Sequence, residues 1–284
     1  MKKVVLIFMC LVTIAFSQEK VKLRAVSTAQ FTTEMLLAIG AEDQMIGTSF
    51  LDDEILPKYK EKYDNIPVLS KKAPTKELFY SINPNFLIGW SSITKQGALG
   101  PEDELKENGV EVYLTKSQNS NKVEDIYIDI LTLGEKFGKV ENSKKVIEQL
   151  KSDIEEAKII SKGKKVKVFA YDSQEMAPFT IGKNGIGNTI IENAGGKNIF
   201  DDSSFSFGVG SWERVIDENP DYIIIVDYGN KSYEEKVKFL KERSPISDVS
   251  AVKNNRFIKM PLSSLSSGVR VGQAIKQLAK ELYK

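Results

Sequence analysis

Two carboxylates at matching positions are the side chains whose type and spacing point most directly to a task. Glu77 is followed by five residues and then by Asn-Pro-Asn-Phe-Leu-Ile, and Glu213 by five residues and then by Asn-Pro-Asp-Tyr-Ile-Ile. In each copy an amphipathic stretch ends at a proline, which cannot continue a helix, and an apolar β-rich run begins. Each copy therefore predicts a helix, a tight turn and a buried strand. Two related half-chains predict two similar lobes, and a cleft between lobes is where small ligands usually bind.

The composition excludes most metal and nucleophilic chemistry. The chain has no histidine and one cysteine, Cys10. The usual ligands of zinc, copper and haem iron are therefore missing, as are Ser-His-Asp and Cys-His mechanisms. Carboxylate or tyrosinate ligation stays open, but no clustered spacing indicates it. We expect no cofactor and no resident metal, and any metal handled would arrive inside a chelator.

The first residues predict export. Lys2 and Lys3 precede an apolar run over residues 4–16, and small residues near position 17 predict cleavage before Gln18. Cys10 lies inside the apolar run rather than after it, so we expect a periplasmic protein without a lipid anchor. A net charge of +1 over 284 residues gives no support for nucleic-acid binding.

Strands and helices alternate along the mature chain. Strands are predicted at 21–26, 45–48, 110–114, 166–171 and 256–260, besides the two in the repeat, and helices at 32–40, 102–107, 188–194, 233–241 and 268–283. This order is typical of an α/β protein with a mainly parallel sheet in each lobe. A helical block over 123–160, interrupted near Gly138 and Asn142, predicts a stiff strut. The expected division is a signal peptide (1–17), an N-terminal lobe (18–121), a linker helix region (122–162) and a C-terminal lobe (163–284).

The ends of the two repeated strands supply the first candidate ligand contacts. Ligands of open parallel sheets sit beyond the carboxyl ends of the strands. Trp90 and Ser91 follow one repeated strand, and Tyr228 follows the other. A core position for Trp90 is the alternative reading. Phe179 and Phe207 lie among serines and glycines, where helix or strand periodicity does not explain them, so they indicate an aromatic wall.

An ordered set of short motifs resembles one known family. The motifs are Val68-Leu69-Ser70, Asn85-Phe86-Leu87-Ile88-Gly89-Trp90, Met176-Ala177-Pro178-Phe179-Thr180-Ile181-Gly182, Ala194-Gly195-Gly196-Lys197-Asn198-Ile199-Phe200, Ser211-Trp212-Glu213-Arg214-Val215 and Gly268-Val269-Arg270. Together they resemble the periplasmic substrate-binding proteins of ABC importers for ferric siderophores, haem and cobalamin. The resemblance implies two Rossmann-like lobes joined by one long interdomain helix, as in type III periplasmic binding proteins. It also implies limited closure of the lobes and no catalysis.

The resemblance assigns roles to individual residues. It implies that Phe179 and Phe207 line the cleft, and that Lys71, Lys72 and Arg270 offer positive charge to an anionic chelate. Glutamates at the two repeat positions would dock into arginine pockets of the permease dimer. A structural role remains open for both, because carboxylates are favoured near helix N-termini.

We expect a monomeric binding protein that captures a ferric siderophore and delivers it to an ABC permease dimer with its ATPase. Cobalamin is the nearest alternative, because Phe179 and Phe207 resemble cobalamin binders. Haem would need Tyr171 or Tyr228 as an axial ligand. An exported hydrolase built on carboxylate pairs and an adaptor that docks to a sensory receptor are further alternatives.

Overall fold

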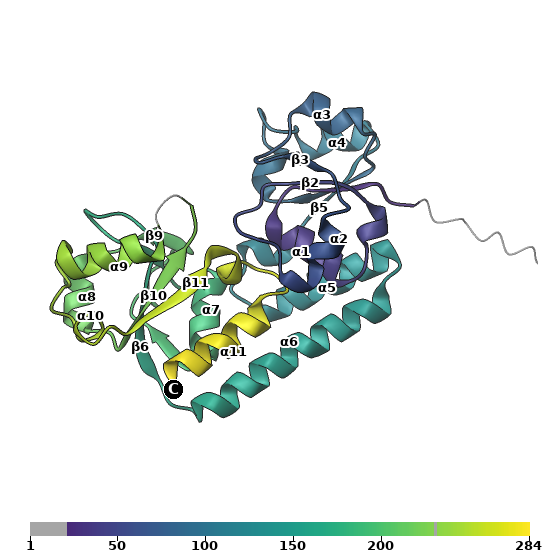
Figure 1. Cartoon of the computed structure of the whole chain (residues 1–284). Coiled ribbons are helices and arrows are strands. Elements are labelled where there is room, and N and C mark those ends of the chain that lie inside the picture. Colours follow the sequence, from purple (N-terminus) through teal and green to yellow (C-terminus); the bar gives the residue numbers. More distant parts are fainter. Residues whose placement is uncertain (1–21, 230–231) are drawn as a thin grey trace, which may run out of the picture.

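The computed structural model describes residues 22–229 and 232–284. Figure 1 shows two α/β lobes joined by long helices. The predicted signal peptide, its cleavage site and Cys10 lie outside the described residues. No helix of the described part of the chain is both long and apolar enough to cross a bilayer.

The N-terminal lobe is built on a five-stranded parallel sheet in the order β3-β2-β1-β4-β5. Its strands are β1 (Ala25–Ser27), β2 (Met45–Ser49), β3 (Val68–Ser70), β4 (Phe86–Gly89) and β5 (Glu111–Leu114). Its helices are α1 (Gln30–Ala38), α2 (Lys60–Tyr63), α3 (Lys76–Ser81), α4 (Glu102–Glu107) and α5 (Val123–Phe137), with single turns η1 (Glu42–Gln44), η2 (Pro57–Tyr59), η3 (Ser91–Thr94) and η4 (Lys116–Asn119).

The C-terminal lobe is also built on a parallel sheet, with four strands in the order β11-β10-β6-β8. A separate antiparallel pair is formed by β7 and β9. The strands are β6 (Val166–Tyr171), β7 (Phe179–Ile181), β8 (Gly196–Asn198), β9 (Phe207–Val209), β10 (Tyr222–Asp227) and β11 (Phe257–Pro261). The helices are α7 (Ile186–Asn193), α8 (Trp212–Glu218), α9 (Tyr233–Glu242), α10 (Ser250–Lys253) and α11 (Val271–Leu282), with the turn η5 (Leu262–Leu265). The predicted α/β fold with two mainly parallel lobes is confirmed.

Both copies of the repeat form the predicted helix, turn and strand, as α3–β4 and α8–β10. The two turns match in detail, because Asn83 and Asn219 both adopt a left-handed backbone, with φ of +54° and +42°. Asparagine tolerates that conformation better than most residues. Each asparagine precedes the proline that prevents the helix from continuing.

Two local predictions at the start of the chain were wrong. The first strand begins only at Ala25, because the backbone N–H groups of Leu23 and Arg24 donate to the side chains of Gln44 and Asn85 instead of to a neighbouring strand. The first helix spans Gln30–Ala38 rather than the predicted residues 32–40. The Thr32 hydroxyl is buried and donates to the Ala29 carbonyl, so it serves the helix from inside its first turn.

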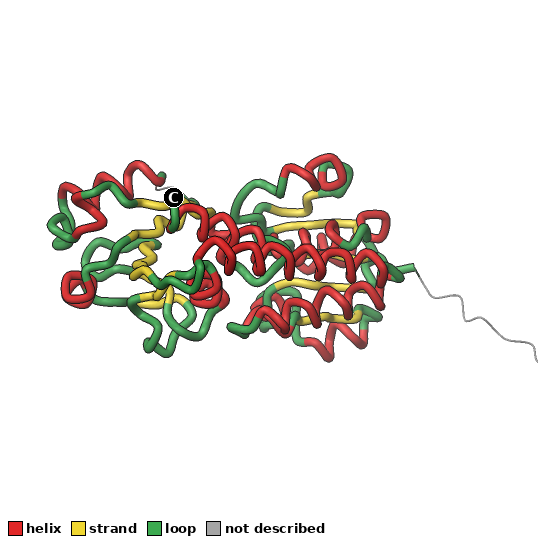
Figure 2. Tube along the Cα trace, turned by 90° about the horizontal axis from the view of Figure 1, so that it is seen from below, coloured by secondary structure: helices red, strands yellow, loops and turns green. Residues whose placement is uncertain are grey.

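The predicted strut is α6 (Val140–Ser161), a helix of 22 residues. Gly138 ends α5 with φ of +69°, as predicted, but Asn142 lies inside α6 and does not interrupt it. α11 lies along α6 in both views (Figures 1 and 2). One hydrophobic core runs without a break from Phe86 in β4 through Leu150 in α6 and Ile275 in α11 to Ile224 in β10. A shared core favours a stiff junction between the lobes.

Candidate functional site

The carboxyl edges of the two sheets meet at the junction between the lobes. The backbone N–H of Ser263, which follows β11, donates to Asp53 Oδ2, which follows β2, at 2.9 Å. The Ser267 hydroxyl donates to the carbonyl of Ser117, which follows β5, at 2.8 Å. Because parallel strands expose their loops and helix N-termini at this edge, the meeting edges form the candidate ligand site of the fold.

A buried ion pair crosses this junction. Arg270 donates from Nε to Glu34 Oε2 at 2.7 Å and from Nη2 to Glu34 Oε1 at 2.5 Å, across 236 positions of sequence. Arg270 is 9% exposed and Glu34 is 1% exposed. Arg270 Nη2 also donates to the carbonyl of Glu54. The positive charge expected from Arg270 is therefore compensated by Glu34, and the pair ties α11 to α1.

Aromatic rings stand on both sides of the junction. Phe179 and Phe207 stack on the β7–β9 pair with ring centroids 6.4 Å apart and planes 21° apart. Trp90, directly after β4, packs against Phe31 with centroids 4.6 Å apart. Trp90, Phe179 and Phe207 are all half-buried, so part of each residue stays accessible.

Tyr228 is the polar member of this aromatic set. Its hydroxyl donates to Asp172 Oδ1 at 2.7 Å, and the buried Lys236 amine lies 4.8 Å from its ring centroid. Burial, with the hydrogen bond and charge of Asp172, raises the pKa of Tyr228 to about 12, and the charge of Asp52 adds to this effect. Asp52 belongs to the other lobe, so the two lobes approach each other at this point. Burial and the neighbouring Asp53 raise the pKa of Asp52 itself.

The remaining predicted contacts lie at the same edge of the N-terminal lobe. The Ser91 backbone N–H donates to Gln118 Oε1 at 2.8 Å, which holds the turn after Trp90 in place. Lys71 and Lys72 follow β3 and are exposed. Tyr171, by contrast, is 2% exposed and packs against Trp212 and Phe239 in the C-terminal lobe's own core. The suggestion that Tyr171 could ligate haem was wrong, because its ring is buried in this core and its hydroxyl donates to the Gln174 carbonyl.

Phe50 lies at this edge, but the sequence analysis did not predict it as a site residue. It directly follows β2 and is 37% exposed. Its φ of +58° lies in the left-handed region, which a bulky side chain rarely adopts. An exposed aromatic ring held at a cost of about 1–3 kcal/mol is typical of a functional position. The available hint was an aromatic residue at a strand's carboxyl end, as at Trp90.

Glu77 and Glu213 occupy equivalent positions in the first turns of α3 and α8. Each follows a capping residue, Thr75 or Ser211, whose hydroxyl accepts a backbone N–H of the first turn. Both glutamates are exposed. Hydrogen bonds from the residue's own backbone N–H and from the cap hydroxyl hold the pKa of each carboxyl below its usual value. Figure 1 places α3 and α8 on different lobes, so the two carboxylates lie far apart in the fold.

Comparisons with known proteins cover most of the chain. A family model described as periplasmic binding protein matches residues 26–263. The uncharacterised ABC transporter substrate-binding lipoprotein YvrC of Bacillus subtilis (strain 168) is 26% identical over 270 residues, which cover 92% of this chain and 80% of that protein. The vitamin B12-binding protein of Yersinia pseudotuberculosis serotype O:3 (strain YPIII) is 22% identical over 204 residues, covering 71% and 69% of the two chains. The crystal structure of a periplasmic binding protein from Veillonella parvula superposes with a TM-score of 0.88 at 34% identity, covering 93% and 92%.

Proposed function

Because this chain belongs to the periplasmic binding protein family and is similar to ABC transporter substrate-binding proteins, we propose that it captures a metal–organic complex between its lobes and delivers it to an ABC permease. The observation that carries this proposal is the set of half-buried aromatic rings at the meeting edges of the two sheets. Rings from both lobes offer apolar faces to a bulky ligand, which is the usual composition of a small-molecule site. One relative is named an ABC transporter substrate-binding lipoprotein and another a vitamin B12-binding protein, which supports a cargo of the iron-complex and cobalamin class.

Within that class, a ferric siderophore of low net charge fits the charges best. Glu34 compensates the charge of Arg270. Of the three predicted cations, Lys71 and Lys72 therefore remain to offer positive charge to a ligand. Asp52 and Asp172 add negative charge at the junction, although the Tyr228 hydroxyl satisfies one oxygen of Asp172. These carboxylates would repel a strongly anionic catecholate or citrate chelate. They would not repel a neutral ferric hydroxamate.

A corrinoid is the second candidate, for which two observations speak. The stacked Phe179 and Phe207 rings form a flat apolar wall, and one relative is named a vitamin B12-binding protein. Haem is less well served. Tyr228 is the remaining tyrosine of the two considered as axial ligands, but its hydroxyl already donates to Asp172 and its raised pKa disfavours the tyrosinate form that would bind iron.

We further propose that capture involves no chemistry on the ligand. Carboxylate pairs that cleave glycosides need one member protonated near neutral pH and a separation of about 5–10 Å. Glu77 and Glu213 are instead exposed on different lobes, and their pKa values are lowered. Both carboxylates are therefore suited to binding cations of a partner protein.

Titration of intrinsic fluorescence tests the ligand class. The chain has two tryptophans, Trp90 at the junction and Trp212 in the core, so Trp90→Phe is the matched control for quenching at the site. The panel holds ferric hydroxamate, ferric catecholate, ferric citrate, cobalamin and haemin, with inner-filter correction. We expect saturable quenching by ferric hydroxamate at a Kd below about 1 µM that Trp90→Phe largely removes. Saturation by cobalamin alone would transfer the assignment to a corrinoid, and no response to any compound would refute both.

Removing one ring of the stacked pair provides a second prediction. Phe207→Ala is expected to weaken binding of the responding ligand by about tenfold or more, because a buried aromatic contact contributes about 1.5–3 kcal/mol. Phe257→Ala is the control, since Phe257 begins β11 at the opposite edge of its sheet. Calorimetry on both variants measures the affinities. Equal affinities for the two variants would contradict the placement of the ligand at the junction.

Phe50→Asn is expected to separate stability from ligand binding. Asparagine adopts the left-handed backbone more easily than phenylalanine, so the free energy of unfolding should rise by about 1 kcal/mol. Loss of the exposed ring should at the same time weaken ligand binding about tenfold. Phe50→Ala removes the ring and keeps the strain, so it should weaken binding without the gain in stability. Urea denaturation and calorimetry measure the two effects, and unchanged affinity in both variants would remove Phe50 from the site.

A further inference from the structure

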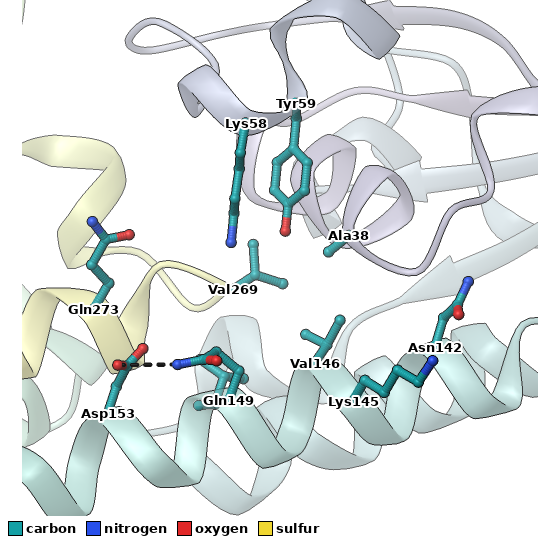
Figure 3. A pocket seen from close by; sticks show the side chains of 11 residues that line it. Ala38, Lys58, Tyr59, Asn142, Lys145, Val146, Gln149, Asp153, Val269 and Gln273 are labelled. Carbon is teal, nitrogen blue, oxygen red and sulfur yellow. Dashed lines mark hydrogen bonds between the residues drawn. The ribbon is translucent and has the colours of Figure 1, made fainter.

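A second cavity lies beside α6, away from the meeting sheet edges. It has a volume of about 230 Å³, is open to solvent, and lies between η2, the end of α1, the first half of α6 and the start of α11. None of the residues that line it belongs to the proposed ligand site. Figure 3 shows Lys58 and Tyr59 reaching from η2 toward Val146 and Val269 on the other side of the cavity. This volume is smaller than that of a typical drug-sized ligand site, so the cavity suits a compact molecule that stays partly in solvent.

The lining combines an apolar floor with cations that lack ion pairs. Ala38, Val146, Leu150 and Val269 supply the apolar surface. Among the described residues, neither Lys58 nor Lys145 forms a salt bridge. The one acidic residue of the lining, Asp153, accepts from Lys276 Nζ at 3.0 Å, so its charge is compensated.

The Tyr59 hydroxyl points into the same space, as Figure 3 shows. Within the described ranges it has no hydrogen-bond partner, although its ring carries the Lys58 amine 4.8 Å from the centroid. An unpartnered hydroxyl and two lysines without ion pairs, set around an apolar floor, form the complement of an anion with an apolar body.

We propose that this cavity is a second small-molecule site, which binds an amphiphilic anion with a carboxylate or sulfonate head and a compact apolar body. The body would lie on Val146, Leu150 and Val269, and the head would lie between Lys58 and Lys145. Aromatic and short aliphatic carboxylates share this chemistry.

Hydrogen bonds connect the lining of this cavity to the buried ion pair between the lobes. The segment that carries Lys58 and Tyr59 is held by Glu34 and Arg270, because the Leu56 N–H donates to Glu34 Oε1 at 3.0 Å and Arg270 donates to the Glu54 carbonyl at 2.7 Å. A molecule that bridges η2 and α6 therefore stabilises the same contacts that tie the lobes together.

The test uses 8-anilinonaphthalene-1-sulfonate as the probe and N-phenyl-1-naphthylamine, which lacks the sulfonate, as its neutral counterpart. We expect the sulfonate to bind the folded protein with a Kd below about 50 µM and the neutral amine to bind at least about tenfold more weakly. Saturating sulfonate should also raise the Tm by mass action. No saturable binding of the sulfonate, or equal binding of both probes, would overturn the proposal.

Variants locate the bound probe. Lys58→Glu with Lys145→Glu should weaken sulfonate binding by at least about tenfold, and Val146→Trp should do the same by filling the cavity without changing its charge. Lys144→Glu is the matched control, because Lys144 is paired with Glu141 at 2.7 Å and does not line the cavity. Phe207→Ala should leave sulfonate binding intact. If Phe207→Ala abolishes binding and the lysine variant does not, the probe occupies the site between the lobes and the second site is refuted.

Discussion

Replacing Glu77 and Glu213 together by lysine is expected to reduce ligand uptake by cells at least about 100-fold while leaving ligand affinity unchanged. Both carboxylates are exposed, and hydrogen bonds within each helix N-terminus lower their pKa values, so both stay ionised under mildly acidic conditions. An ionised carboxylate is the natural partner of an arginine on another protein. Reversing both charges places like charges opposite each other, which costs several kcal/mol.

The measurement combines whole-cell uptake of the labelled ligand with calorimetry on the purified variant. The control is Glu102→Lys with Glu234→Lys, since these exposed glutamates also lie in first turns of helices, α4 and α9. The control should transport normally. If the Glu77 and Glu213 variant transports as well as the control, the two glutamates are not docking groups and their role is confined to the helix N-termini.

Arg270→Ala is expected to lower the free energy of unfolding by about 3–5 kcal/mol. The substitution leaves the Glu34 carboxylate, which is 1% exposed, without its cation, and it frees the Glu54 carbonyl from its donor. Because the pair joins α11 to α1, its loss should also loosen the junction between the lobes. Urea denaturation measures the stability, and small-angle scattering should show a larger radius of gyration.

Two matched variants separate the buried pair from a general effect of charge. The double variant Glu34→Leu and Arg270→Met should be more stable than Arg270→Ala, because it leaves no buried charge unpaired. Lys259→Ala removes an exposed partner of Asp227, 2.8 Å away, and should cost less than about 1 kcal/mol. If Arg270→Ala costs no more than Lys259→Ala, the pair does not hold the junction.

The helix–turn–strand repeat could be read from the sequence because its determinants are local. A proline ends each helix at once, an asparagine before it accepts the left-handed turn, and an apolar run follows. The break between the long helices was also local, since Gly138 alone supplies the left-handed residue that ends α5. The carboxyl-edge rule then located Trp90 and Tyr228, because it depends only on strand order and direction.

The sequence by itself thus determined the two lobes, their parallel sheets and the edges at which the candidate ligand-binding side chains lie. Only the tertiary structure decided which of those side chains can contact a ligand and which are paired or buried in the core. The partner of Arg270 lies 236 positions away in another lobe, and no spacing rule reaches that far. Tyr171 ends β6 with its ring in the core and Asp172 follows it toward Tyr228, because successive side chains of a strand point to opposite faces. The strain at Phe50 likewise exists only in the folded backbone.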